Sequence, residues 1–107
     1  MIKVEVHYQK DGKIVGVSVE GHTRQGPSGK DIYCAGVSIL THSAYMGMTK
    51  HLKRKVKEEL DIGKFSMFLV DPPDALTNAI FETMILGILE VKKLIPKAIE
   101  ITCIEDR

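Results

Sequence analysis

The segment over residues 2–20 constrains the fold most, because its side chains alternate between apolar and polar. Residues 2–8 alternate in this way, the pair Asp11-Gly12 follows, and the alternation resumes over residues 15–19. A period of two predicts strands with one covered face, and Asp-Gly is typical of a tight turn. The chain is therefore predicted to open with a β-hairpin that must bury one face against another layer.

A helix and a second hairpin are predicted to follow. A polar, glycine-rich loop over residues 21–30 comes first, and loops of this length in small domains are often functional. Asp31 is a typical N-cap residue and begins a helical pattern that reaches about residue 50. Residues 54–60 and 65–70 predict two strands joined by a turn. The second of these is apolar on both faces, which indicates a central strand or an oligomer contact.

A second helix and a final strand complete the predicted order. The helix runs over residues 74–94 and stops before a proline. Apolar residues cover most of its circumference, so it is predicted to be deeply buried or partly covered by another subunit. Ile99, Ile101 and Cys103 alternate as a strand, with Cys103 in the core. The order β-β-α-β-β-α-β implies one α+β domain over residues 1–107, with two helices packed on a mostly antiparallel sheet.

Charge and composition argue against several classes of protein. A net charge of +1 on 107 residues argues against broad coating of nucleic acid. No apolar run approaches the ~20 residues of a membrane span, and the start lacks the layout of a secretion signal. We therefore expect a cytoplasmic protein without a membrane partner. Two cysteines are too few for a disulfide framework, and without a CxxC or HxxxH pattern we expect neither a metal nor another cofactor.

A histidine and a cysteine flank the glycine-rich loop. If Asp31 is the N-cap, Cys34 lies in the first helical turn, where backbone N–H groups and the helix dipole favour a thiolate. The same N–H groups are placed to hold an oxyanion. His22, at the start of the loop, would take the thiol proton and later return it to a leaving amine. The pair predicts acyl transfer, provided that the loop folds back and brings the two side chains together.

Several of these residues have a simpler structural reading. Cysteines outside active sites are usually small buried hydrophobes, and Cys34 is open to that reading. Asp31 either caps the helix or orients the imidazole of His22 as the third member of a triad. Ser38 lies one turn after Cys34 on the same helical face. A hydrogen bond within the site and close helix packing both account for a serine there.

The residues around this pair resemble a known family. The bacterial ribosomal-processing cysteine proteases have a pattern of Gly-His, a flexible loop, and the run Asp-Ile-Val-Cys-Ala-Ala-Val-Ser. This chain resembles that pattern: it has Gly21-His22, a loop containing glycine, and then a similar run. The second run here is Gly29-Lys30-Asp31-Ile32-Tyr33-Cys34-Ala35-Gly36-Val37-Ser38. The resemblance extends over essentially the whole chain, and the Gly-His and Asp-x-x-Cys elements are its most specific part.

The resemblance implies an α+β fold, a homodimer and a function. Members of the family remove a short N-terminal extension from large-subunit ribosomal protein twenty-seven during ribosome assembly, so a ribosomal protein precursor would be the peptide substrate. The catalytic pair would fall on Cys34 and His22. The family's conserved Gly, Asp and Ser positions would fall on Gly21, Asp31 and Ser38. Apart from the resemblance, the glycine content of the loop over residues 23–30 predicts that the loop closes over an extended substrate peptide.

Three residues depart from the family pattern. Thr23 stands where alanine is common, Tyr33 replaces a valine, and Gly36 replaces an alanine. None of these changes removes a reacting group. Tyr33 lies beside the cysteine, so the resemblance leaves the cleavage preference open.

The alternative function is that of a non-catalytic binding module associated with the ribosome or RNA. A local basic run suggests it: Lys50, Lys53, Arg54, Lys55 and Lys57. Lysines of this kind more often protect an edge strand, and the near-neutral net charge weakens the case for RNA. A cysteine endopeptidase is therefore the function that the sequence favours.

Overall fold

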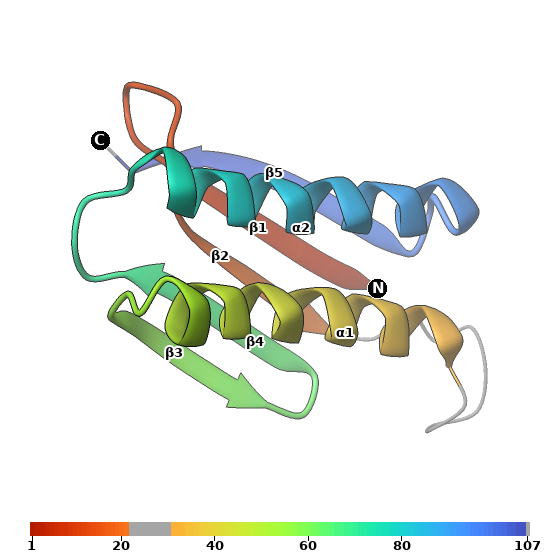
Figure 1. Ribbon diagram of the computed structural model, residues 1–107. Helices are drawn as coiled ribbons and strands as arrows, with labels where there is room; N and C mark the ends of the chain where they lie inside the picture. The colour runs from red at the N-terminus through yellow and green to blue at the C-terminus, as the bar shows by residue number, and fades with distance from the viewer. Residues whose placement is uncertain (22–30, 107) are drawn as a thin grey trace.

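Two helices lie on one face of a five-stranded sheet in the structure, which is a computed structural model that describes residues 1–21 and 31–106 (Figure 1). The predicted order of elements and the α+β class are confirmed. The strands are β1 (Ile2–Tyr8), β2 (Ile14–Gly21), β3 (Val56–Asp61), β4 (Lys64–Leu69) and β5 (Ile99–Glu105), and the helices are α1 (Ile32–Met46) and α2 (Ala75–Leu94). None of the helices in the described ranges is long and apolar enough to span a membrane.

The sheet is mostly antiparallel, as predicted. Its strand order is β3-β4-β2-β1-β5, and the β1–β5 pair is parallel whereas the other three pairs are antiparallel. A parallel neighbour requires a crossover, which α2 supplies between β4 and β5. Because β4 lies between β3 and β2, it is a central strand, and this explains why it is apolar on both faces. Phe65 and Met67 are buried under the helices, and Phe68 covers Gly16 on the opposite face.

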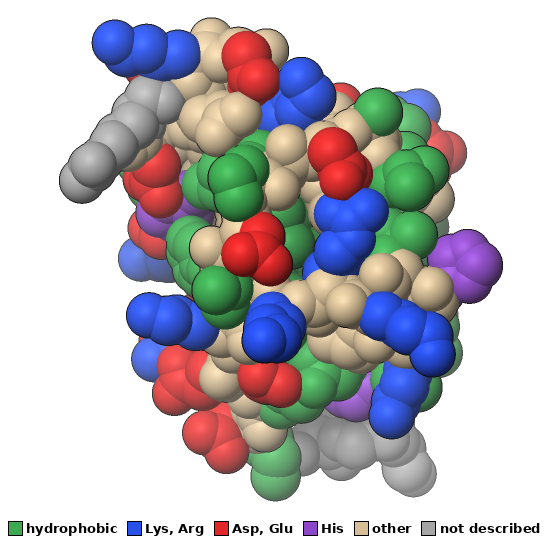
Figure 2. All heavy atoms as spheres, turned by 60° about the vertical axis from the view of Figure 1, so that its left-hand side comes forward, with side chains coloured by type: hydrophobic (Ala, Val, Ile, Leu, Met, Phe, Trp, Pro, Cys, Tyr) green, Lys and Arg blue, Asp and Glu red, His purple; other side chains and the backbone are tan. Residues whose placement is uncertain are grey.

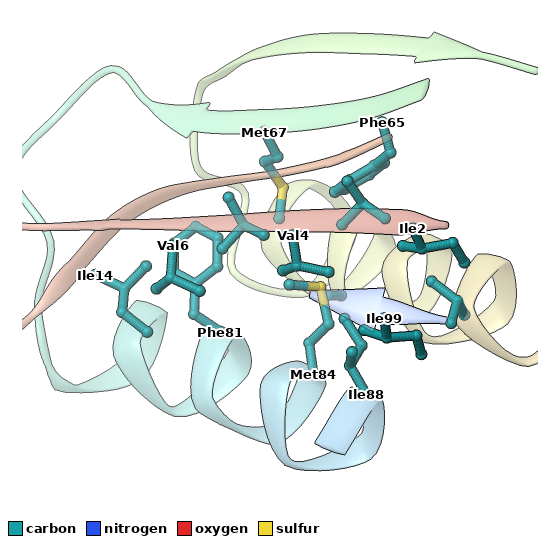
Figure 3. Close-up of a cluster of buried hydrophobic side chains, with 14 of the residues drawn as sticks. Ile2, Val4, Val6, Ile14, Phe65, Met67, Phe81, Met84, Ile88 and Ile99 are labelled. Atoms are coloured by element: carbon teal, nitrogen blue, oxygen red, sulfur yellow. The ribbon is translucent and has the colours of Figure 1, made fainter. Parts of the chain in front are cut away.

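The core lies between the helices and the sheet. Side chains of β1 and α2 meet there, as Figure 3 shows for Val4 and Met84, which are 1% and 2% exposed. Burial of such a side chain contributes about 1.5–3 kcal/mol to folding. The labelled members of the cluster are Ile2, Val4, Val6, Ile14, Phe65, Met67, Phe81, Met84, Ile88 and Ile99. This core fixes α2 on the sheet and gives α1 a rigid surface to pack against.

Both helices begin at the aspartates that the sequence indicates. Asp31 caps α1, and Asp74 caps α2 in a capping box with Thr77. The first helix continues beyond Met46 into one π-helical turn, η1 (Gly47–His51), so the helical path ends close to the predicted residue 50.

The prediction that Cys103 packs in the core is wrong, because its side chain is exposed. It pairs with Val6, which is buried, but β5 is an edge strand with a neighbour on one side only. Burial along β5 falls from Ile99 to Cys103 as the strand proceeds. Alternation predicts which face a side chain points to, and it does not predict whether another layer covers that position.

Candidate active site

Cys34 lines an open pocket at one end of the sheet. The pocket has a volume of about 890 Å³ and lies between the first three turns of α1, the turn joining β3 to β4, and the ends of β1 and β2. Its lining comprises Ile2, Val19, Gly21, Asp31, Cys34, Ala35, Val37, Ser38, Thr41, His42, Leu60, Asp61, Ile62, Gly63, Lys64 and Phe65. The cysteine is therefore half-buried against the core and still reachable from the pocket.

The start of α1 determines where Cys34 lies. Asp31 has an extended backbone, and its Oδ1 accepts hydrogen bonds from the backbone N–H of Tyr33 at 3.0 Å and of Cys34 at 3.1 Å. These bonds satisfy two of the helix-start donors and hold Cys34 in the first turn. The capping role considered for Asp31 is therefore present in the structure.

The same two bonds change the expected source of oxyanion stabilisation. The N–H groups of Tyr33 and Cys34 are directed at the Asp31 carboxylate. An amide that already donates to a carboxylate is not preorganised for a substrate oxygen. The prediction that these helix-start amides form the oxyanion hole is therefore not supported by this arrangement.

Gly21 brings the end of β2 to the pocket. Its φ of +106° lies in the region that favours glycine, and a Cβ there would lie 2.2 Å from the carbonyl oxygen of Met1. Its N–H donates to the Gly63 carbonyl at 2.9 Å, which joins the end of β2 to the tip of the β3–β4 hairpin. A glycine at this position is therefore required both by conformation and by the close approach of β1.

His22 lies outside the described residues, as does the loop over residues 23–30 predicted to close over the substrate. The preceding residue, Gly21, lines the same pocket as Cys34. The structure thus places the residue before His22 and the cysteine at one site.

The other three histidines are all described, and their positions are unsuited to act on Cys34. His7 lies on the uncovered face of the sheet, with its Nδ1 3.0 Å from an Asp106 oxygen and its ring edge-on to Phe68 at 4.9 Å. It points away from the covered face, and 16% of its side chain is exposed. His51 ends η1, beyond the far end of α1.

His42 lines the pocket but is two helical turns from the cysteine. Eight residues of α-helix span about 12 Å, which is beyond hydrogen-bond reach. His42 was not predicted to belong to the site, although the spacing of Cys34, Ser38 and His42 by four residues indicates one helical face. Ser38 is exposed and lines the pocket between the other two.

No metal centre is formed by the described part of the chain, where no three His, Cys, Asp or Glu side chains are grouped to hold an ion. The chemistry that the pocket offers is that of a thiol at a helix start beside polar and apolar walls. Leu60, Ile62 and Phe65 of the β3–β4 hairpin contribute apolar surface to the pocket, and no local motif in the sequence connects this hairpin with the cysteine.

A sequence model of the cysteine protease Prp family matches residues 1–100. The chain belongs to this family. Its relatives include the ribosomal processing cysteine protease Prp of Staphylococcus aureus (strain Mu50), which is 27% identical over 96 residues, a match that covers 87% of this chain and 90% of the relative. The S. aureus (strain NCTC 8325) protein of the same name matches to the same extent. The resemblance stated from the sequence is thereby confirmed.

Solved structures of similar proteins show the same fold. The S. aureus ribosomal processing protease Prp with a covalently linked product peptide has a TM-score of 0.89 at 24% identity. A structure of the S. aureus protease with a substrate peptide has a TM-score of 0.83 at 23% identity, and both matches cover 96% of this chain and 99% of the other. Because the family is one of cysteine proteases, the chain is an enzyme of that class, and a non-catalytic binding module is not favoured.

Proposed function

We propose that this chain is a cysteine endopeptidase that removes the N-terminal extension of a ribosomal protein, with Cys34 as nucleophile and His22 as general base. One observation carries the proposal. Cys34, at the start of α1, lines an open pocket whose opposite side is formed by Gly21, the residue immediately before His22.

The assignment of Cys34 follows from comparing the two cysteines of a cysteine protease. Cys103 is exposed on an edge strand and does not line the pocket. Cys34 lies in the first turn of a helix, where the helix dipole favours a thiolate, and a concave apolar and polar surface surrounds it. A peptide bond has room to approach its sulfur from the pocket.

The assignment of His22 rests on its place in the chain and on the positions of the other histidines. His7 lies on the opposite face of the sheet, His42 is about 12 Å along the helix, and His51 is farther still. His22 directly follows Gly21, which ends β2 and lines the pocket. We therefore assign the general base to His22.

The reaction proceeds in two halves. His22 takes the proton of the Cys34 thiol, and the sulfur forms a bond to the scissile carbonyl carbon. As the C–N bond breaks, the imidazolium gives its proton to the leaving amine, leaving a thioester on Cys34. Water then loses a proton to His22 and attacks the thioester, and the released thiolate regains that proton.

Three neighbours have supporting roles in this proposal. Asp31 is a positioning residue, because its cap holds Cys34 in the first turn. Gly21 positions the start of the segment that carries His22. Ser38 lines the pocket one turn from Cys34, and its hydroxyl is placed to donate to the substrate peptide.

The substrate is proposed to be the precursor of large-subunit ribosomal protein twenty-seven, processed in the cytoplasm by a homodimer. The names of the S. aureus relatives, which describe ribosomal processing, support a ribosomal substrate. A nucleic-acid partner has less support. On the face shown in Figure 2, Lys and Arg side chains lie among Asp and Glu side chains, which does not resemble the single-sign surface of an RNA-binding protein.

Incubation with the extended ribosomal precursor, followed by mass spectrometry, tests the proposal. Wild type and the Cys103→Ala and His51→Ala controls, whose residues do not line the pocket, are expected to release the extension. Cys34→Ala is expected to release none, and His22→Ala is expected to be slower by about 10²–10⁴-fold. Processing that persists in Cys34→Ala rejects the nucleophile. Normal processing by His22→Ala rejects the general base.

A further inference from the structure

An isoleucine at the tip of the β3–β4 hairpin is the most exposed large apolar side chain of the described residues. Ile62 is 98% exposed and occupies the first position of the two-residue turn between Asp61 and Lys64. It also lines the pocket that holds Cys34. An apolar side chain in full contact with water, next to a nucleophile, calls for a physical reason.

Neither the turn nor the core supplies that reason. Gly63 has a φ of +74°, as the second central position of a type II turn requires, and the first position of such a turn accepts most residues. A polar residue at position 62 would form the same hairpin. A side chain that is 98% exposed also gains nothing from burial when the chain folds.

The position of Ile62 relative to the cysteine is well fixed. The carbonyl of the adjacent Gly63 accepts the Gly21 N–H at 2.9 Å, which ties the hairpin tip to the end of β2. The Asp61–Lys64 pair closes the hairpin directly below the turn. The tip is therefore attached to two neighbouring parts of the site and does not project alone into solvent.

The hairpin side of the pocket presents apolar side chains beside Ile62, together with the charged residues Asp61 and Lys64, and α1 contributes exposed polar side chains. Leu60 is 42% exposed and Phe65 is 7% exposed, and both line the pocket from the hairpin. Ser38 and His42 are both exposed and line it from α1. A peptide lying between the two walls would place its side chains against the hairpin and offer hydrogen bonds to α1.

From this arrangement we infer that Ile62 is a specificity-determining residue. Together with Leu60 it forms an apolar subsite that binds an aliphatic or aromatic side chain of the substrate peptide near the scissile bond. The inference rests on the proposed protease function and adds the chemistry of one substrate position. When the substrate binds, contact with its apolar side chain would bury Ile62, which is exposed to water in the folded protein.

A peptide series tests the subsite. A fluorogenic peptide spanning the precursor's cleavage junction is compared with variants in which each apolar residue in turn is serine. Ile62→Ser is expected to lower kcat/KM on the parent peptide about tenfold, mainly through KM, which corresponds to ~1.4 kcal/mol. For the one peptide that lacks the cognate side chain, wild type and Ile62→Ser are expected to be equal, because the two changes remove the same contact.

Val70→Ser is the matched control. Val70 is 54% exposed at the opposite end of the same hairpin and does not line the pocket. Its substitution is expected to leave kcat/KM on every peptide unchanged. Melting temperatures of both variants are expected to match wild type, because the turn accepts serine at position 62 and the Val70 side chain is 54% exposed. An Ile62→Ser enzyme with wild-type kcat/KM, or with the same loss on every peptide, overturns the inference.

Binding to an inactive protein separates this inference from the proposed function. Fluorescence anisotropy of the same peptides is measured on Cys34→Ala and on Cys34→Ala combined with Ile62→Ser. If wild type fails to cleave the parent peptide, the proposed function fails. The inferred subsite is supported if adding Ile62→Ser to Cys34→Ala weakens peptide binding about tenfold. It is rejected if both proteins bind the peptides with the same affinity.

Discussion

Gly21 is the residue whose backbone most constrains the site. Its positive φ favours glycine, and the carbonyl oxygen of Met1 lies 2.2 Å from where a Cβ would stand. Gly12 also has a positive φ, of +90°, but a Cβ there would meet no atom within 4 Å. A substitution at Gly12 therefore introduces backbone strain alone, whereas the same substitution at Gly21 introduces both strain and a close contact.

Gly21→Ala is expected to destabilise the fold by more than Gly12→Ala. Strain alone costs about 1–2 kcal/mol for an alanine at positive φ. The contact with Met1 adds a cost in the first variant only, and it should displace the segment leading to His22. Urea unfolding measures the stabilities, and cleavage of the precursor measures the site. Equal stability losses would show that β1 yields easily to a methyl group at position 21.

At the scale of elements, α1 and α2 are held together by small residues that let the helices approach closely. A Cβ on Gly36 of α1 would lie 3.9 Å from a methyl group of Val91, which is an ordinary contact. A Cβ on Gly87 of α2 would lie 2.6 Å from a Leu40 methyl group, so that side chain must move. The two glycines are thus equivalent in helix propensity and different in packing.

Gly36→Ala is expected to stabilise the protein by about 0.5–1 kcal/mol, because alanine loses less backbone entropy in a helix. Gly87→Ala gains the same propensity but must displace Leu40, and overpacking costs about 1–3 kcal/mol. It should therefore be the less stable of the two variants. Chemical denaturation of both proteins checks the order, and a reversed order would contradict this account of the helix interface.

The cap of α2 gives the fold a pH dependence. The Thr77 backbone N–H and, next, the Arg54 guanidinium, 2.6 Å from Asp74, hold the pKa of the Asp74 carboxyl below its ordinary value of 3.8. A carboxyl with a depressed folded-state pKa stabilises the fold above its unfolded pKa. That stabilisation is lost as pH falls through the folded value.

Melting temperature is therefore expected to fall below about pH 4 in wild type, and to fall less steeply in Asp74→Asn. Asp71→Asn, three residues earlier, is the charge-matched control, and its profile should follow wild type. Part of the acid sensitivity is expected to remain in Asp74→Asn, because a backbone bond from Lys13 also lowers the pKa of Asp11. Identical acid profiles for Asp74→Asn and wild type would count against the cap as the cause.

The strands and helix starts could be predicted from the sequence, because the patterns that indicate them involve residues close together in the chain. Alternation predicted the strands, and Asp31 and Asp74 predicted the helix starts, because caps and periodicity depend on neighbouring residues. The exposure of Cys103 was not predictable, since it depends on the cover provided by distant elements. The hydrogen bonds from the Tyr33 and Cys34 amides to Asp31 follow from the predicted cap, yet their consequence for the oxyanion becomes clear only from the distances.

The pocket belongs to the scale of the whole molecule. Cys34, Gly21 and Ile62 come from three separate stretches of the chain, and the strand order β4-β2-β1 with α1 above it brings them together. The sequence indicates the cysteine and the glycine through their local motif. No local motif in the sequence indicates that the hairpin tip lines this pocket, because the position of the tip depends on the register between β2 and β4.

The homodimer implied by the family resemblance also belongs to this scale and remains a prediction. Along α1, Ile32, Ile39 and Met46 are 71%, 66% and 46% exposed. A spacing of seven residues places them on one helical face, so they form an exposed apolar ridge along α1, which lies beside α2 on the sheet (Figure 1). Contiguous apolar surface of this kind marks interaction sites more often than scattered residues do.

Sedimentation equilibrium is therefore expected to give a mass twice that of the 107-residue chain. Ile39→Glu should shift the equilibrium towards the monomer, because dimer formation would then bury two unpaired carboxylates, one from each copy. Val70→Glu adds the same charge at another exposed apolar position and should leave the dimer intact. A monomeric wild type at concentrations of about 100 µM, well above the micromolar dissociation constants of weak specific complexes, would contradict the prediction. Equal dissociation of both variants would place the interface elsewhere than on the α1 ridge.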